Sequence, residues 1–142
     1  MEGEKLIRLE HEELRVLEEF LGALTAERDA IISFSLEGII RENNRKEEIL
    51  KRLEYIEAEK EKLLSSPDDR AVMAESEAWR SLGERLEARV REVKTALEKN
   101  MKLLSFSMDY VKSSIENIIG LLNRSAYGKK RDRISLLLSR SV

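Results

Sequence analysis

The sequence predicts an all-α protein: a long antiparallel helical hairpin with coiled-coil-like spacing and a short basic C-terminal tail. Three observations lead to this fold class. The 142-residue chain contains one proline and six glycines, so little in it interrupts a helix. Charged residues make up 38% of the chain, which suits the long solvated faces of elongated helices. Apolar residues recur at steps of three and four over two long segments, the spacing of one helix face.

The first segment, residues 4–64, is expected to form one long helix. In its middle the apolar register shifts, and more apolar side chains occur there than one partner helix can cover: Ile31, Ile32, Phe34, Leu36, Ile39 and Ile40. Gly22 and Gly38 flank this stretch. Because glycine weakens a helix by about 1 kcal/mol relative to alanine, we expect the helix to bend between them.

The only proline marks the expected turn, at residues 65–69. Ser66 is placed to cap a following helix, and Pro67 suits its first position. Asp68 and Asp69 then complement the positive end of the helix dipole. These residues predict that one helix ends near residue 64 and that another begins at the proline.

The second helix is expected over residues 67–126, ending before Gly128, which can adopt the left-handed conformation that closes a helix. Folded back on the first helix, it completes a hairpin domain of residues 1–128. Its C-terminal half keeps a strict heptad pattern, here called the heptad stripe: Met101, Leu104, Met108, Val111, Ile115, Ile118 and Leu122. We expect the heptad stripe to pack against the first helix.

Further apolar side chains fall outside that stripe and form the candidate binding surface. They are Leu103, Phe106, Tyr110, Ile119 and Leu121. Such a surface suits an amphipathic helix of a partner protein, with the aromatic rings as anchors. Two alternatives remain at this point: a homodimer that forms a four-helix bundle, and packing of the chain's own tail.

The tail, residues 129–142, is basic and is expected to be a short helix or disordered. It contains Lys129, Lys130, Arg131 and Arg133 and a short apolar run from Ile134 to Leu138. A basic segment of this kind suits electrostatic docking to an acidic protein more than nucleic-acid binding, because the whole chain carries a formal charge of −2.

Composition excludes several classes of protein. The absence of cysteine excludes disulfide scaffolds, thiolate zinc sites and cysteine nucleophiles. No apolar run is long enough to span a membrane, and the acidic N-terminus is unlike a signal peptide, so we expect a cytoplasmic protein without membrane insertion.

No catalytic, cofactor or metal site is expected. His11 is the only histidine and lies among glutamates, but glutamates at that density are usual on a solvated helix face. No glycine-rich phosphate loop and no serine on a strand-to-helix turn occur. We therefore expect a protein that is not an enzyme.

Several segments resemble the FlgN family of flagellar export chaperones: the acidic first helix with leucines at 14–24, Asn43 to Leu50, Asn100 to Leu104 and Ala126-Tyr127-Gly128. The resemblance implies a cytoplasmic chaperone that binds hook-associated (hook–filament junction) proteins through their terminal helices and prevents their premature assembly. It also implies delivery of these clients to the export gate of the flagellar type III secretion apparatus. Tyr127 matches the position implicated in docking on the gate.

Overall fold

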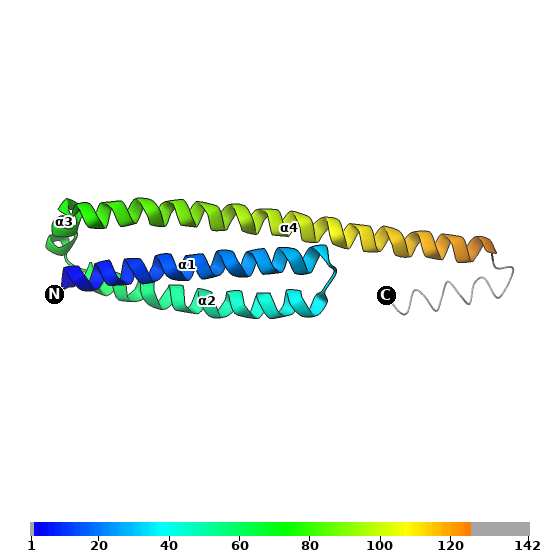
Figure 1. Cartoon of the computed structure of the whole chain (residues 1–142), viewed down its shortest axis with the longest axis horizontal. Helices are drawn as coiled ribbons and strands as arrows, with labels where there is room; N and C mark the ends of the chain where they lie inside the picture. The colour runs from blue at the N-terminus through cyan, green and yellow to red at the C-terminus, as the bar shows by residue number, and fades with distance from the viewer. Residues whose placement is uncertain (1, 126–142) are drawn as a thin grey trace. The chain divides into compact units, whose positions relative to one another are not determined.

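The computed structural model describes residues 2–125, which contain four α-helices and no strand. They are α1 (Glu2–Ile32), α2 (Leu36–Leu63), α3 (Pro67–Glu75) and α4 (Glu77–Ser125) (Figure 1). The all-α prediction is therefore confirmed for this part of the chain. The protein divides into two compact units, residues 1–103 and 104–142, and the boundary falls within α4. Tyr127 and the predicted tail, 129–142, lie outside the described residues.

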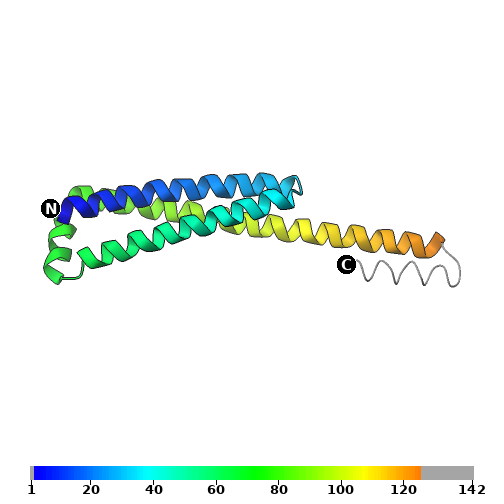
Figure 2. The ribbon, with the colours of Figure 1, turned by 90° about the horizontal axis from the view of Figure 1, so that it is seen from below.

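The predicted single helix over residues 4–64 is wrong, because the chain forms two helices there. Helix α1 ends at Ile32 and α2 begins at Leu36, and the two lie antiparallel (Figures 1 and 2). Ser35 caps α2, since its Oγ accepts a hydrogen bond from the backbone N–H of Gly38 at 3.1 Å. Phe34 adopts a left-handed backbone conformation with φ of 55°, which reverses the chain. The break lies within the stretch where a bend was expected.

Gly38 allows the two helices to approach closely beside this turn. A Cβ atom at this position would lie 2.9 Å from the Cβ of Ala30 on α1. Real Cβ atoms do not approach so closely. The helical hairpin of the structure is thus formed by α1 and α2 about residues 33–35, and the predicted pairing of 4–64 with 67–126 about the proline is corrected.

The predicted cap at the proline is confirmed. The Ser66 Oγ accepts a hydrogen bond from the backbone N–H of Asp69 at 3.1 Å, with Pro67 at the start of α3. The predicted helix over 67–126 is divided, however, since α3 ends at Glu75 and α4 begins at Glu77. Ser76 between them has an extended backbone, and its Oγ accepts a hydrogen bond from the N–H of Trp79 at 3.3 Å. A second serine cap therefore separates the two helices.

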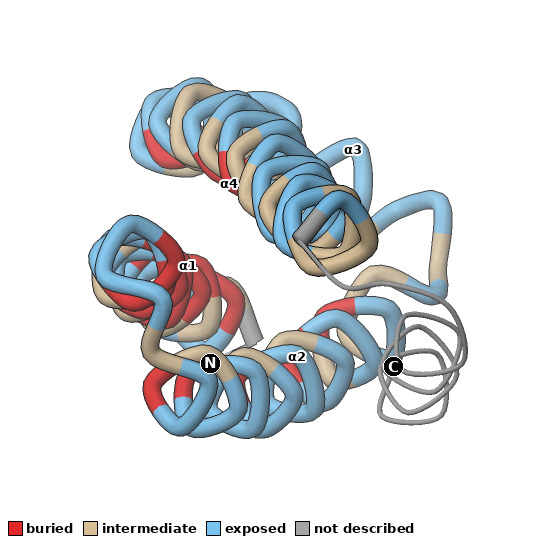
Figure 3. Tube along the Cα trace, turned by 90° about the vertical axis from the view of Figure 1, so that its right-hand side faces the viewer, coloured by how far each residue is buried: buried red, intermediate tan, exposed pale blue. Residues whose placement is uncertain are grey.

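The core of the first unit is built from three helices. Its central cluster of buried apolar residues consists of Val16, Leu17, Phe20, Ala23 and Leu24 on α1, Ile49 and Ile56 on α2, and Val93 on α4. Leu86, Val90, Ala96 and Leu97 of α4 pack against this cluster. Figure 3 shows the densest run of buried residues on α1. Residues 77–103 of α4 thus complete a three-helix bundle with α1 and α2.

A buried ion cluster joins α1 to α2 in this bundle. The Lys60 Nζ donates hydrogen bonds to Glu10 at 2.9 Å and Glu13 at 2.7 Å, and it lies 5.8 Å from the centre of the Trp79 ring. Burial raises the pKa of Glu13 to about 7, and a hydrogen bond to Glu57 contributes to the rise. That same hydrogen bond lowers the pKa of Glu57.

A candidate protein-binding surface on α4

In the second unit, the described residues 104–125 form a single helical segment that is rich in exposed apolar side chains. Phe106 is 73% exposed, Tyr110 66% and Met108 65%. By contrast, Leu82 and Val93 of α4, in the first unit, are 5% and 8% exposed. Large apolar side chains grouped on a surface in this way make the segment a candidate for interaction with another protein.

The heptad stripe is part of this exposed surface, which corrects the prediction that it packs against the first helix. Met101, Leu104, Val111 and Ile118 are exposed, and Ile115 and Leu122 are half-buried. The reason is the break near residue 34. It divides the first segment into helices of 31 and 28 residues, whereas α4 has 49. At 1.5 Å per residue, α4 is therefore longer than either helix by roughly 30 Å.

The predicted binding residues are not all on one face of α4. Phe106, Tyr110 and Leu121 are exposed, whereas Leu103 and Ile119 are half-buried. At 100° per residue, the first three and Leu103 fall on one face, here called the aromatic stripe. Ile119 lies roughly 160° from Leu103, at the edge of the heptad stripe. The helical period alone could have shown this difference.

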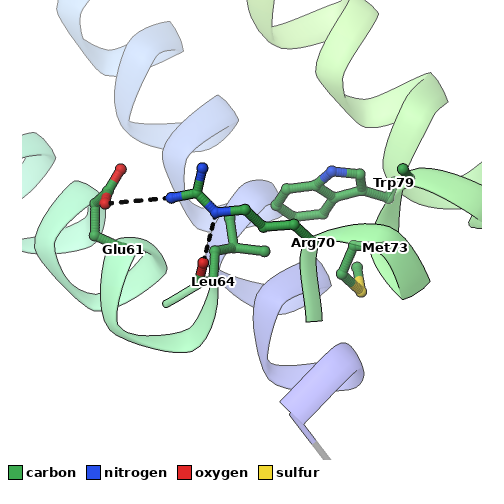
Figure 4. A pocket seen from close by; sticks show the side chains of 6 residues that line it. Glu61, Leu64, Arg70, Met73 and Trp79 are labelled. Carbon is green, nitrogen blue, oxygen red and sulfur yellow. Dashed lines mark hydrogen bonds and ion pairs between the residues drawn. The ribbon is translucent and has the colours of Figure 1, made fainter. Parts of the chain in front are cut away.

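A pocket of about 260 Å³ lies elsewhere, between the end of α2, α3 and the start of α4 (Figure 4). Arg70 reaches across it, and its Nε donates a hydrogen bond to the backbone carbonyl of Leu64 at 2.7 Å. The same guanidinium lies 4.0 Å from the carboxylate of Glu61. Met73, Ala74 and Trp79 supply the apolar lining. These contacts connect α3 to α2, so we assign the pocket a structural role.

The described part of the chain offers no group of three or more metal-binding side chains, and His11 is exposed. Within the same residues, no helix is long and apolar enough to cross a membrane.

Comparison with known proteins identifies the family. The family model described as FlgN protein matches residues 1–132. The chain belongs to the FlgN family. No curated protein and no solved structure matches it. As a member of the FlgN family, the protein has the general role of a flagellar export chaperone and binds flagellar proteins. The matched region includes the whole exposed segment of α4 and extends past Tyr127 to residue 132.

Proposed function

We propose that this FlgN-family chain is a cytoplasmic chaperone for hook-associated proteins and binds their terminal helices through residues 104–122 of α4. The observation that carries this proposal is the exposure of Phe106, Met108 and Ile118, which are 73%, 65% and 53% exposed. Apolar residues at helical spacing on an exposed helix suit an amphipathic helix of a client. Covering that client helix would prevent premature assembly. The role requires no catalysis, cofactor or metal.

Delivery to the flagellar type III export gate forms the second part of the proposal. The matched family region includes Tyr127, which we propose as the gate-docking residue. Client binding and gate docking would then use different residues of the chain. Substitution of the tyrosine should consequently reduce export without changing client affinity.

A homodimer is a second candidate use of the same surface. The heptad stripe keeps its register from Met101 to Leu122, and such a pattern also favours pairing of two identical helices. Sedimentation equilibrium of the purified chain separates the two uses. A tight dimer that does not bind hook-associated proteins would support the structural role.

The proposal is tested by titration calorimetry of the chain with each full-length hook-associated protein from the same genome. We expect a dissociation constant in the micromolar range or tighter for at least one of them. Flagellin serves as the control and should bind at least about tenfold more weakly. Absence of binding to every hook-associated protein would contradict the proposal.

A further inference from the structure

The charged side chains in the C-terminal half of α4 gather on one narrow side of the helix. Between Met101 and Asn123 they are Lys102, Asp109, Lys112 and Glu116. At 100° per residue, all four fall within a sector of roughly 80°. An ordinary surface helix carries its charges over the whole face opposite one apolar stripe. Here the charge-free part of the helix circumference is much wider than one apolar stripe.

Two apolar stripes lie within the charge-free part. The heptad stripe and the aromatic stripe are centred roughly 130° apart, and together they cover roughly 220° of the helix. Ser107 and Ser114 lie between them and are half-buried. Their small side chains leave room for a helix to approach on either side. One packed helix covers an arc of about 100°, so a single partner helix cannot cover both stripes.

The first unit shows how wide an arc of α4 is covered by two packed helices. Between residues 77 and 103, α4 packs against both α1 and α2 through Leu86, Val90 and Val93. The covered residues there span an arc of only roughly 120°. In the first unit, two helices therefore cover an arc narrower than the one that the heptad and aromatic stripes span together.

We propose that residues 104–122 of α4 bind two amphipathic helices of one client side by side and complete a three-helix bundle with them. One client helix covers the heptad stripe and the other covers the aromatic stripe. No charged side chain lies within the two stripes or between them, where Ser107 and Ser114 lie, so the recognition is apolar rather than ionic. This inference rests on the proposed function, because that function supplies a client with terminal helices.

The arrangement is tested by placing a photo-cross-linking amino acid at one position at a time in the full chain. Met108 represents the heptad stripe, Phe106 the aromatic stripe and Glu116 the charged sector. The probe is the full-length hook-associated protein that binds in calorimetry. We expect cross-links from Met108 and from Phe106 to two different segments of one client molecule in a 1:1 complex. The control position should give less than about a tenth of their yield.

Substitutions give a second readout. Met108→Lys and Phe106→Lys should each lower client affinity at least about tenfold. Each substitution should also remove the client contact of the stripe that carries it. The cross-link from position 106 should therefore persist in the Met108→Lys chain, and the cross-link from position 108 should persist in the Phe106→Lys chain. Glu116→Lys changes the charge on the opposite side and should leave the affinity within about twofold.

The other outcomes overturn the inference in distinguishable ways. Cross-links from both stripes to one client segment would show a single bound helix. Links between two copies of the chain would identify a homodimer, and links to residues 126–142 would identify the chain's own tail as the cover. In these cases the proposed function survives if the client still binds. Failure to bind any hook-associated protein would remove the proposed function and this inference together.

Discussion

The side-chain amide of Asn100 on α4 donates a hydrogen bond to the backbone carbonyl oxygen of Leu24 on α1, with an Nδ2–O distance of 2.9 Å. The same Nδ2 donates to Glu27 at 3.0 Å, and Lys46 on α2 lies 2.6 Å from that carboxylate. Helices α1, α2 and α4 therefore meet at one buried polar cluster. The next residue along α4, Met101, is 71% exposed.

Asn100→Asp should destabilise the first unit by about 2 to 4 kcal/mol, because a carboxylate would replace the amide donor beside Glu27 and the Leu24 carbonyl. Urea unfolding followed by circular dichroism measures the change. Adding Glu27→Gln returns a donor opposite the new carboxylate and should recover part of the loss. If the double variant is as unstable as the sum of the two single variants, the amide contact does not couple these residues.

Gly38→Ala should lower the free energy of unfolding by about 1 to 3 kcal/mol. The new Cβ would lie 2.9 Å from the Ala30 Cβ and 3.0 Å from the Ser35 Oγ, so α1 and α2 would have to separate. Gly83→Ala is the matched control, since nothing lies within 4 Å of the Cβ that alanine would add there. It should stabilise the helix by about 0.5 to 1 kcal/mol. Equal effects of the two substitutions in thermal melting would argue against close packing at the turn.

Glu13 should make the stability of the bundle depend on pH. Burial raises its pKa to about 7, whereas the unfolded carboxyl titrates near its usual value of about 4.3. The stabilisation from the bound proton is complete below the unfolded pKa and is lost as pH rises through the folded one. The free energy of unfolding should therefore fall by about 1 to 3 kcal/mol between pH 5 and pH 8.

The lowered pKa of Glu57 acts in a different window. Its contribution to the free energy of unfolding is present above the pKa of the unfolded carboxyl. That contribution is lost as the pH falls below it, through the lowered pKa of the folded state. Glu13→Gln, which keeps an oxygen acceptor for Lys60, should flatten the dependence between pH 5 and pH 8. Exposed Glu4→Gln should leave it unchanged. An unaltered slope in the Glu13→Gln variant would assign the pH dependence to other groups.

Local signals in the sequence predicted the fold where one residue type decides the structure. Ser66 and Pro67 indicated the correct start of α3, and the stretch between Gly22 and Gly38, where only a bend was predicted, contains the break between α1 and α2. The break itself was missed, because heptad spacing continues on both sides of residue 34 and does not record the left-handed φ of Phe34. The Ser76 cap was also missed, because no proline or glycine stands beside it to mark the end of a helix.

The candidate surface could be predicted only in part. Phe106 and Tyr110 were predicted to be exposed, and they are. The heptad stripe was predicted to be core because its spacing is that of a helix with a partner. Periodicity specifies that a face needs a partner, but it does not specify whether the partner belongs to the same chain. The exposure of the heptad stripe followed from the division of the first segment into α1 and α2, each shorter than α4.

The central claim is that the C-terminal half of α4 is a surface for clients rather than a core. Paired thermal melting and client calorimetry of Ile118→Asp and Phe106→Asp, beside Val93→Asp in the buried cluster, test it most directly. We predict that the first two melt within about 3 °C of the unsubstituted chain but bind the hook-associated client at least about tenfold more weakly. Val93→Asp should unfold, because it buries an unpaired charge. If Ile118→Asp melts as early as Val93→Asp, or keeps full client affinity, the claim is contradicted.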